Sequence, residues 1–124
     1  MSDFGGVNEA VNLYFDALYY CDIERLAMAF HPKAIYATAD ESPLLYRTME
    51  EYFPIVAARE SGASRGEVRR DVIDGIEFAG KNTAFARVRC SIGSRNFIDF
   101  LTLVRLDKRW QIMSKVFQIN DISQ

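Results

Sequence analysis

Near the C-terminus, residues 96–119 read NFIDFLTLVRLDKRWQIMSKVFQI, and this stretch predicts a β-hairpin. Its turn is Asp107-Lys108, which separates two runs rich in aromatic and β-branched residues. The even positions of the first run are Ile98, Phe100, Thr102, Val104 and Leu106, and the odd positions include Phe97, Leu101 and Leu103. Both faces are largely apolar, whereas a strand with one face in water alternates apolar and polar residues.

Two further strands precede this hairpin, over residues 69–78 and 83–92. Turns of Gly and polar residues bound them, at 80–82 and 93–95. The four runs predict an antiparallel meander. Residues 34–38 form one more short β-like run.

The first sixty residues predict three helices. Apolar residues at positions 7, 10, 11, 14, 17 and 18 have the spacing of an amphipathic helix over residues 7–20. Asp22 is an N-cap for a second helix over residues 23–30. A T-x-x-E capping box opens a third helix over about residues 48–60. Helices followed by an antiparallel sheet predict an α+β fold.

Length and charge limit the classes of protein to consider. The chain has 124 residues, so residues 1–124 are expected to form one domain. A net charge of −2 includes no basic excess that would suggest a nucleic-acid partner. The N-terminal MSDFGGVNEA lacks a signal-peptide pattern, and no apolar run has the length of a membrane span. We therefore expect a cytoplasmic protein without a nucleic-acid or membrane partner.

The chain contains one histidine, His31, and two cysteines, Cys21 and Cys90. The cysteines are far apart and lack C-x-x-C spacing, so both are expected to be reduced thiols. These residues do not make a zinc site, and the glycines lack the spacing of a phosphate-binding loop. Neither a metal nor a cofactor is predicted. His31 would lie at a helix end, where a protonated imidazole is favourable, and a catalytic role is the alternative.

The two apolar faces of the last strands need two different partners. One face covers the helices, but a domain of this length has no second layer for the other face. We predict a homodimer through the outer face of the sheet, because two-fold contacts are the commonest in oligomers. Arg87, Arg89, Asp99 and Arg105 are interpreted as polar residues that specify this interface.

The direction of Asp99 depends on the turn before it. A three-residue loop at 93–95 would place Arg89 opposite Asp99, whereas a two-residue loop would place Val88 there. Opposite charges favour the first register. A shift by one residue would turn Asp99 inward and would strengthen the case for an enzyme.

Several motifs carry a resemblance to a known superfamily. They are YFDAL at 14–18, CDIE at 21–24, FHPKA at 30–34, FIDFLTLVR at 97–105 and RWQI at 109–112. In this order the chain resembles the nuclear transport factor two-like (cystatin-like) superfamily, which includes ketosteroid isomerases and SnoaL-like polyketide cyclases. It most resembles the branch named putative lumazine-binding. The resemblance implies a cone-shaped half-barrel, in which a curved, mostly antiparallel sheet wraps around three helices and leaves a deep pocket. Since this superfamily hosts unrelated functions, the fold alone implies no activity.

A ketosteroid isomerase needs a carboxylate base, with a tyrosine and a neutral carboxylic acid that donate hydrogen bonds to the developing oxyanion. Aligned on residues 22–24, Tyr14 falls on the tyrosine and Thr38 on the base. Aligned on the third strand of the meander, Thr102 falls on the acid. The resemblance therefore disfavours steroid isomerisation, because a threonine hydroxyl is no base near neutral pH. Asp40 is either a displaced base on the same side as Thr38 or a solvated loop residue.

Lys115 is predicted to point into the pocket. The Asp107-Lys108 turn pairs Phe100 with Lys115 and Thr102 with Met113, and the resemblance places the same residues on the pocket side. A buried ammonium is costly unless it meets a carboxylate or an anionic ligand. Lys115 therefore has an internal partner, reaches the pocket mouth, or anchors a carboxylate, enolate or carbonyl group of a ligand.

The predicted function is binding of a small aromatic or polycyclic molecule in an apolar pocket. One alternative is an isomerase, cyclase or lyase in which Tyr14 acts with Asp40 or Lys115. The other is a structural dimerisation domain with a collapsed pocket. The predicted pocket residues are Tyr14, Thr38, Phe53, Val88, Phe100, Thr102, Met113, Lys115 and Phe117.

Overall fold

The computed structural model describes residues 3–121. Its elements are α1 (Phe4–Tyr20), α2 (Ile23–Ala29), β1 (Phe30–Thr38), β2 (Leu45–Thr48), α3 (Met49–Ala57), β3 (Val72–Ala79), β4 (Thr83–Ile92), β5 (Arg95–Leu106) and β6 (Arg109–Asp121). The strands form one sheet in the order β2-β1-β6-β5-β4-β3. The β1–β6 pair is parallel and the other neighbours are antiparallel. The predicted α+β fold is confirmed.

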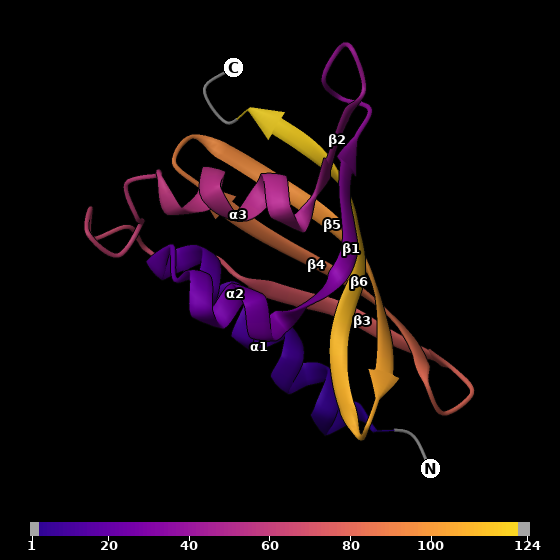
Figure 1. Cartoon of the computed structure of the whole chain (residues 1–124). Helices are drawn as coiled ribbons and strands as arrows, with labels where there is room; N and C mark the ends of the chain where they lie inside the picture. Colours follow the sequence, from indigo (N-terminus) through magenta and orange to yellow (C-terminus); the bar gives the residue numbers. More distant parts are fainter. Residues whose placement is uncertain (1–2, 122–124) are drawn as a thin grey trace.

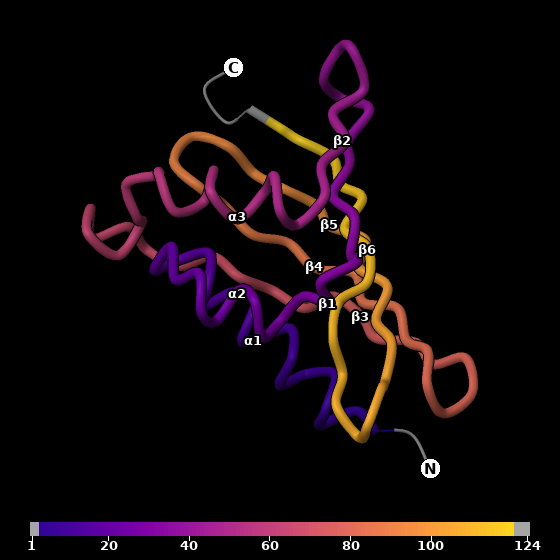
Figure 2. The backbone as a smooth tube through the Cα atoms, in the orientation of Figure 1, coloured from indigo at the N-terminus to yellow at the C-terminus, as the bar shows by residue number. Residues whose placement is uncertain are grey.

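The three helices lie against one face of the curved sheet, and together they form a cone (Figures 1 and 2). The core fills the space between them, because the apolar stripe of α1 meets the inner face of the central strands. Fully buried core side chains include Val7, Val11 and Tyr14 of α1, and Leu101, Leu103 and Ile112 of the sheet.

The predicted starts of α2 and α3 are confirmed by their caps, whereas α1 begins at Phe4, capped by Asp3, rather than at residue 7. The Asp22 side chain accepts hydrogen bonds from the backbone of the first turn of α2, and Thr48 forms the predicted capping box with Glu51. α2 ends at Ala29 instead of residue 30, because Phe30 already has the extended backbone of β1.

Two strand boundaries differ from the prediction, and one strand was not predicted. β1 is longer than residues 34–38, and β2 was missed because its four residues are too few for an alternating pattern. β3 begins at Val72 rather than at residue 69, because its pairing with β4 begins at Val72↔Arg89. His31 lies inside β1 rather than at a helix end, and its Nδ1 accepts from the Lys33 N–H at 3.0 Å.

Two local features set the direction of every side chain on β5. The β4–β5 loop has two residues, so Ile92 pairs with Arg95 and Val88 lies opposite Asp99. The expected Arg89–Asp99 pair is therefore wrong, and Arg89 instead binds Asp74 through two hydrogen bonds of 2.8 and 2.9 Å.

The second feature is a β-bulge in the β5–β6 hairpin. The predicted turn is confirmed, because Leu106 pairs with Arg109 across it. Beyond Leu103↔Ile112 the register shifts at Met113, so Lys115 lies opposite Leu101 instead of Phe100. A bulge adds one unpaired residue to one strand. Beyond it, each side chain lies on the same face as a different partner from the one that a regular hairpin predicts.

These features turn Asp99 inward and Phe100 outward. Asp99 is 0% exposed and Lys115 is 4% exposed, whereas Phe100 is 45% exposed. The expectation that Phe100 and Thr102 face the pocket is therefore wrong, and both lie on the outer face of the sheet. The interpretation of Asp99 as an outer interface residue is wrong for the same reason.

Candidate functional site

A group of polar side chains is enclosed between α1 and the inner face of β5 and β6. The Tyr14 phenol donates a hydrogen bond of 2.6 Å to Oδ2 of Asp99, and both side chains are fully buried. Tyr14 lies on the buried stripe of α1, Asp99 is turned inward by the two-residue loop, and Lys115 is turned inward by the bulge. The sequence analysis placed Asp99 on the outer face of the sheet. The signal that could have indicated a buried site was a lone carboxylate within an apolar run.

The Asp99 carboxyl group is incompletely hydrogen-bonded. Its Oδ2 also lies 3.8 Å from the Cys90 thiol, which donates to it weakly. Its Oδ1 has no hydrogen-bond partner among the described residues. A buried polar atom without a partner costs about 1–3 kcal/mol, so Oδ1 is a free acceptor inside the protein.

The Lys115 ammonium is surrounded by aromatic rings. Its Nζ lies 5.2 Å from the ring centroid of Tyr14, 5.2 Å from Tyr36, 5.7 Å from Tyr52 and 4.9 Å from Phe117. Within the described part of the chain, no hydrogen bond or ion pair reaches Nζ. The rings replace part of its lost hydration through cation–π attraction.

Burial and charge set the protonation of this group. Desolvation lowers the pKa of Lys115, but the Asp99 charge and the neighbouring tyrosines outweigh it and raise that pKa above its ordinary value. Burial, followed by the Asp99 charge, raises the pKa of Tyr14 and that of Cys90. Near neutral pH the site therefore presents an ammonium, a phenol and a thiol around one carboxyl group.

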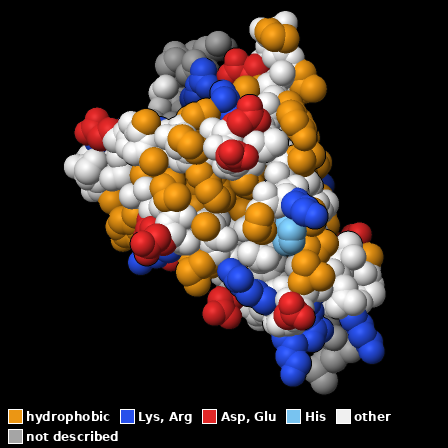
Figure 3. Space-filling model, viewed as in Figure 1, with side chains coloured by type: hydrophobic (Ala, Val, Ile, Leu, Met, Phe, Trp, Pro, Cys, Tyr) orange, Lys and Arg blue, Asp and Glu red, His pale blue; other side chains and the backbone are white. Residues whose placement is uncertain are grey.

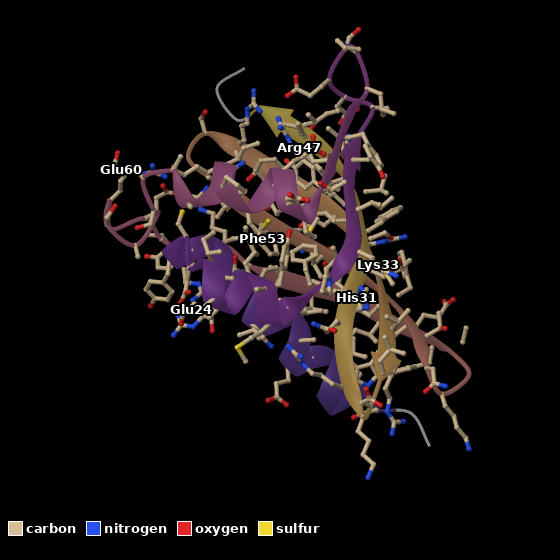
Figure 4. All side chains as sticks on the ribbon, in the orientation of Figure 1. Glu24, His31, Lys33, Arg47, Phe53 and Glu60 are labelled. Atoms are coloured by element: carbon tan, nitrogen blue, oxygen red, sulfur yellow. The ribbon has the colours of Figure 1, made fainter. Side chains whose placement is uncertain are left out.

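Other predicted pocket residues lie around this group. Val88 and Phe117 are buried on the inner face, and Phe117 packs on Tyr36 with ring centroids 4.7 Å apart. Met113 is half-buried in the bulge. Phe53 is half-buried and lies between α3 and α2 (Figure 4). Hydrophobic side chains gather at the surface over this region (Figure 3).

The Thr38 hydroxyl is hydrogen-bonded to the backbone on both sides. Its hydroxyl donates to the Phe117 carbonyl at 2.7 Å and accepts from the Asp40 N–H at 3.1 Å. Thr38 therefore ties the end of β1 to β6.

Asp40 lies away from Tyr14. It is exposed, its Oδ2 accepts from the Ile119 N–H at 2.8 Å, and it borders a hollow on the outer face beside Phe100 and Val116. Of the two alternatives for Asp40, the displaced base on the same side as Thr38 is wrong, because β1 ends at Thr38 and Asp40 is an exposed residue of the following loop.

The open end of the cone contains a small cavity of about 30 Å³. Its walls include Leu18, Cys21, Arg59, Glu67, Arg69 and Cys90. Cys90 lines this cavity, and its thiol also contacts Asp99, so this residue connects the cavity wall with the buried polar group. Within residues 3–120, no three His, Cys, Asp or Glu side chains are grouped to hold a metal. No helix of the described chain is long and apolar enough to cross a membrane.

Residues 2–118 match the family described as putative lumazine-binding. The chain belongs to this family. Several solved structures are similar to this member of the putative lumazine-binding family. One is a nuclear transport factor two-like protein of unknown function from Methylobacillus flagellatus, with 24% identity, a TM-score of 0.82, and coverage of 95% of this chain and 92% of that chain. Another, from Shewanella baltica, has 19% identity, a TM-score of 0.82, and coverage of 95% and 94%.

A cystatin-like fold protein from Burkholderia xenovorans has 16% identity and a TM-score of 0.71, over 94% of this chain and 91% of that chain. These similarities establish the cone-shaped nuclear transport factor two-like fold. No curated protein matches the chain.

Proposed function

We propose that this member of the putative lumazine-binding family binds a small aromatic or polycyclic molecule inside the cone, next to Tyr14, Asp99 and Lys115. The observation that carries the proposal is the unpartnered Oδ1 of Asp99 near an ammonium that no described residue pairs. Buried polar groups are normally satisfied, so a donor on the ligand would satisfy Oδ1, and a carboxylate or carbonyl group of the ligand would pair with the Lys115 ammonium.

The surrounding rings favour a flat ligand. Tyr36 and Tyr52 are stacked with centroids 4.3 Å apart, and Phe117 lies against Tyr36. Such faces pack well on planar molecules, and a ligand that enters between them must separate them, because the rings contact one another. The family description supports the same class of ligand.

A planar aromatic ligand is expected to stabilise the protein measurably. At 100 times its dissociation constant, a ligand of the folded state adds about 2.7 kcal/mol, which raises the melting temperature by several degrees. Differential scanning fluorimetry with lumazine, 2-naphthoate and 2-naphthol tests this expectation.

Two variants that replace lysine by methionine test the site, one at Lys115 and one at Lys33 as the matched control. Lys115→Met should abolish the shift caused by 2-naphthoate, whereas Lys33→Met should keep it, because Lys33 is exposed on β1 (Figure 4). If none of the three compounds shifts the melting temperature of the wild type, the collapsed structural domain is the better description.

The short Tyr14–Asp99 hydrogen bond favours a second candidate function, isomerase or lyase chemistry at the same site. Asp99 takes the place that the sequence prediction gave to Asp40, and the Lys115 ammonium would stabilise an enolate. Tyr14→Phe is expected to lower turnover of a β,γ-unsaturated ketone by tenfold or more, as for the loss of one proton-handling group. Ultraviolet absorbance of the conjugated product measures the turnover rate. Unchanged turnover in Tyr14→Phe would exclude the phenol from the reaction.

The outer face of the sheet supports the predicted homodimer. Phe100 and Val116 are about half exposed there, and a contiguous apolar surface on an antiparallel sheet fits a second copy of the same face. Val116→Glu is expected to convert dimer to monomer in sedimentation velocity, whereas Val68→Glu, at a 78% exposed residue, should not. A monomeric wild type would contradict the proposal. The cytoplasmic location stays a prediction.

A further inference from the structure

The open end of the cone is crossed by the loop of residues 58–71, between α3 and β3 (Figure 1). Two hydrogen bonds join it to the last turn of α1. The Tyr19 phenol donates to the Glu67 carbonyl at 2.7 Å, and the Ala63 N–H donates to the Tyr19 carbonyl at 3.1 Å. Arg69 adds an ion pair of 2.8 Å with Asp16 of α1.

Glu67 connects this loop to a second element. Its Oε1 accepts from the Gly93 N–H at 3.0 Å, in the two-residue turn between β4 and β5. Its Oε2 is paired with Arg65 of the same loop. One residue therefore links the loop to α1 and to the rim of the sheet, on both sides of the cone mouth.

The loop is held by polar contacts rather than by buried apolar surface. Its largest apolar side chain, Val68, is 78% exposed, and the Glu67–Gly93 bond is exposed. Each such contact contributes little in water. Segments with few buried apolar contacts open without unfolding of the core, so this loop can detach while the cone stays folded.

Gly62 brings the loop close to the aromatic ring of Tyr19. A Cβ at this position would lie 3.3 Å from two ring carbons, closer than an ordinary contact. A larger side chain at residue 62 would therefore push the loop away from α1.

The loop also forms one wall of the cavity at the open end. Arg59, Glu67 and Arg69 line this wall, and Cys90 of β4 lines the same cavity. Since the Cys90 thiol touches Asp99, displacement of the loop would open a route from solvent past Cys90 to the polar group of the interior.

We propose that residues 58–71 are a lid over the mouth of the cone, latched by Glu67, whose opening admits the ligand past Cys90. The proposal concerns access to the site under Proposed function and rests on it.

Reaction of Cys90 with methyl methanethiosulfonate measures lid opening without any ligand. The Cys90 thiolate attacks the divalent sulfur, a methyl disulfide forms and methanesulfinate leaves. A Cys21→Ser background removes the other thiol at the mouth. In that background, Glu67→Ala is expected to increase the rate of modification about fivefold, as the loss of an exposed charged contact allows, and intact-mass spectrometry measures this rate. Gly62→Val is expected to increase it as well.

Asp3→Ala is the matched control. Like Glu67, this carboxylate accepts two hydrogen bonds, from Gly6 and Trp110, each of 2.9 Å, but at the start of α1. Its rate should equal that of the background. The lid proposal would be overturned if Glu67→Ala and Asp3→Ala increased the rate of Cys90 modification equally. It would also be overturned if neither Glu67→Ala nor Gly62→Val increased this rate. Faster modification without any ligand-induced melting shift would support the lid and contradict the binding function.

Discussion

Replacing Asp99 by asparagine is expected to lower the free energy of unfolding by about 3 kcal/mol at pH 7, the usual cost of an uncompensated buried charge. The amide still offers an oxygen to the Tyr14 phenol, so the change removes charge rather than shape. Lys115 then keeps a buried ammonium without the carboxylate that raises its pKa. Urea denaturation of both proteins measures the difference.

The pH dependence of this difference provides a sharper test. In the wild type the folded pKa of Lys115 lies above the unfolded value of 10.5, so its stabilising contribution is fully present up to about pH 10. In the variant, desolvation is the dominant remaining influence and lowers the folded pKa below the unfolded value. The resulting penalty is full at pH 7 and is relieved as the pH rises toward 10.

The stability gap between wild type and Asp99→Asn should therefore shrink between pH 7 and pH 10. Asp99→Asn/Lys115→Met serves as the control, because it lacks both charges and its gap from the wild type should change little over this range. A gap that is equally wide at both pH values in the single variant would show that Lys115 and Asp99 do not interact.

Tyr14→Phe is expected to destabilise the protein by about 3 kcal/mol, the upper end for a hydrogen bond to a charged group. The substitution removes the 2.6 Å donor of Asp99 and leaves that carboxyl group with only the weak Cys90 contact. Thermal and urea unfolding measure the loss. Tyr52→Phe removes a hydroxyl from a neighbouring buried ring, and among the described residues this hydroxyl has no hydrogen bond. An equal loss in the two variants would show that the Tyr14–Asp99 bond has no special weight.

Much of the architecture could be predicted from local patterns. The apolar spacing of α1, the cap at Asp22 and the capping box at Thr48 act within one or two turns of a helix, and each was located correctly. The Asp107-Lys108 turn is equally local, since both residues adopt the positive φ that such a hairpin turn requires. These signals, with the motif resemblance, were sufficient for the α+β cone.

The inner face of β6 was also predicted in part, because Lys115 and Phe117 do point inward. The residues that lie opposite Lys115 and Phe117 differ from the prediction. In a regular hairpin Phe100 would share the face of Lys115, and no local sequence pattern indicates the extra residue at Met113.

Helix positions, capping residues and the final turn follow from interactions between near neighbours, so the chain specifies them wherever they occur. The composition of the buried site does not follow in this way. A two-residue loop and a one-residue bulge turn Asp99 toward Tyr14 and Phe100 toward solvent. Each depends on the pairing of whole strands and on the packing of α1 against them, since a strand's side chains reverse direction with every single-residue shift. The assembled sheet therefore selects which side chains meet in the interior.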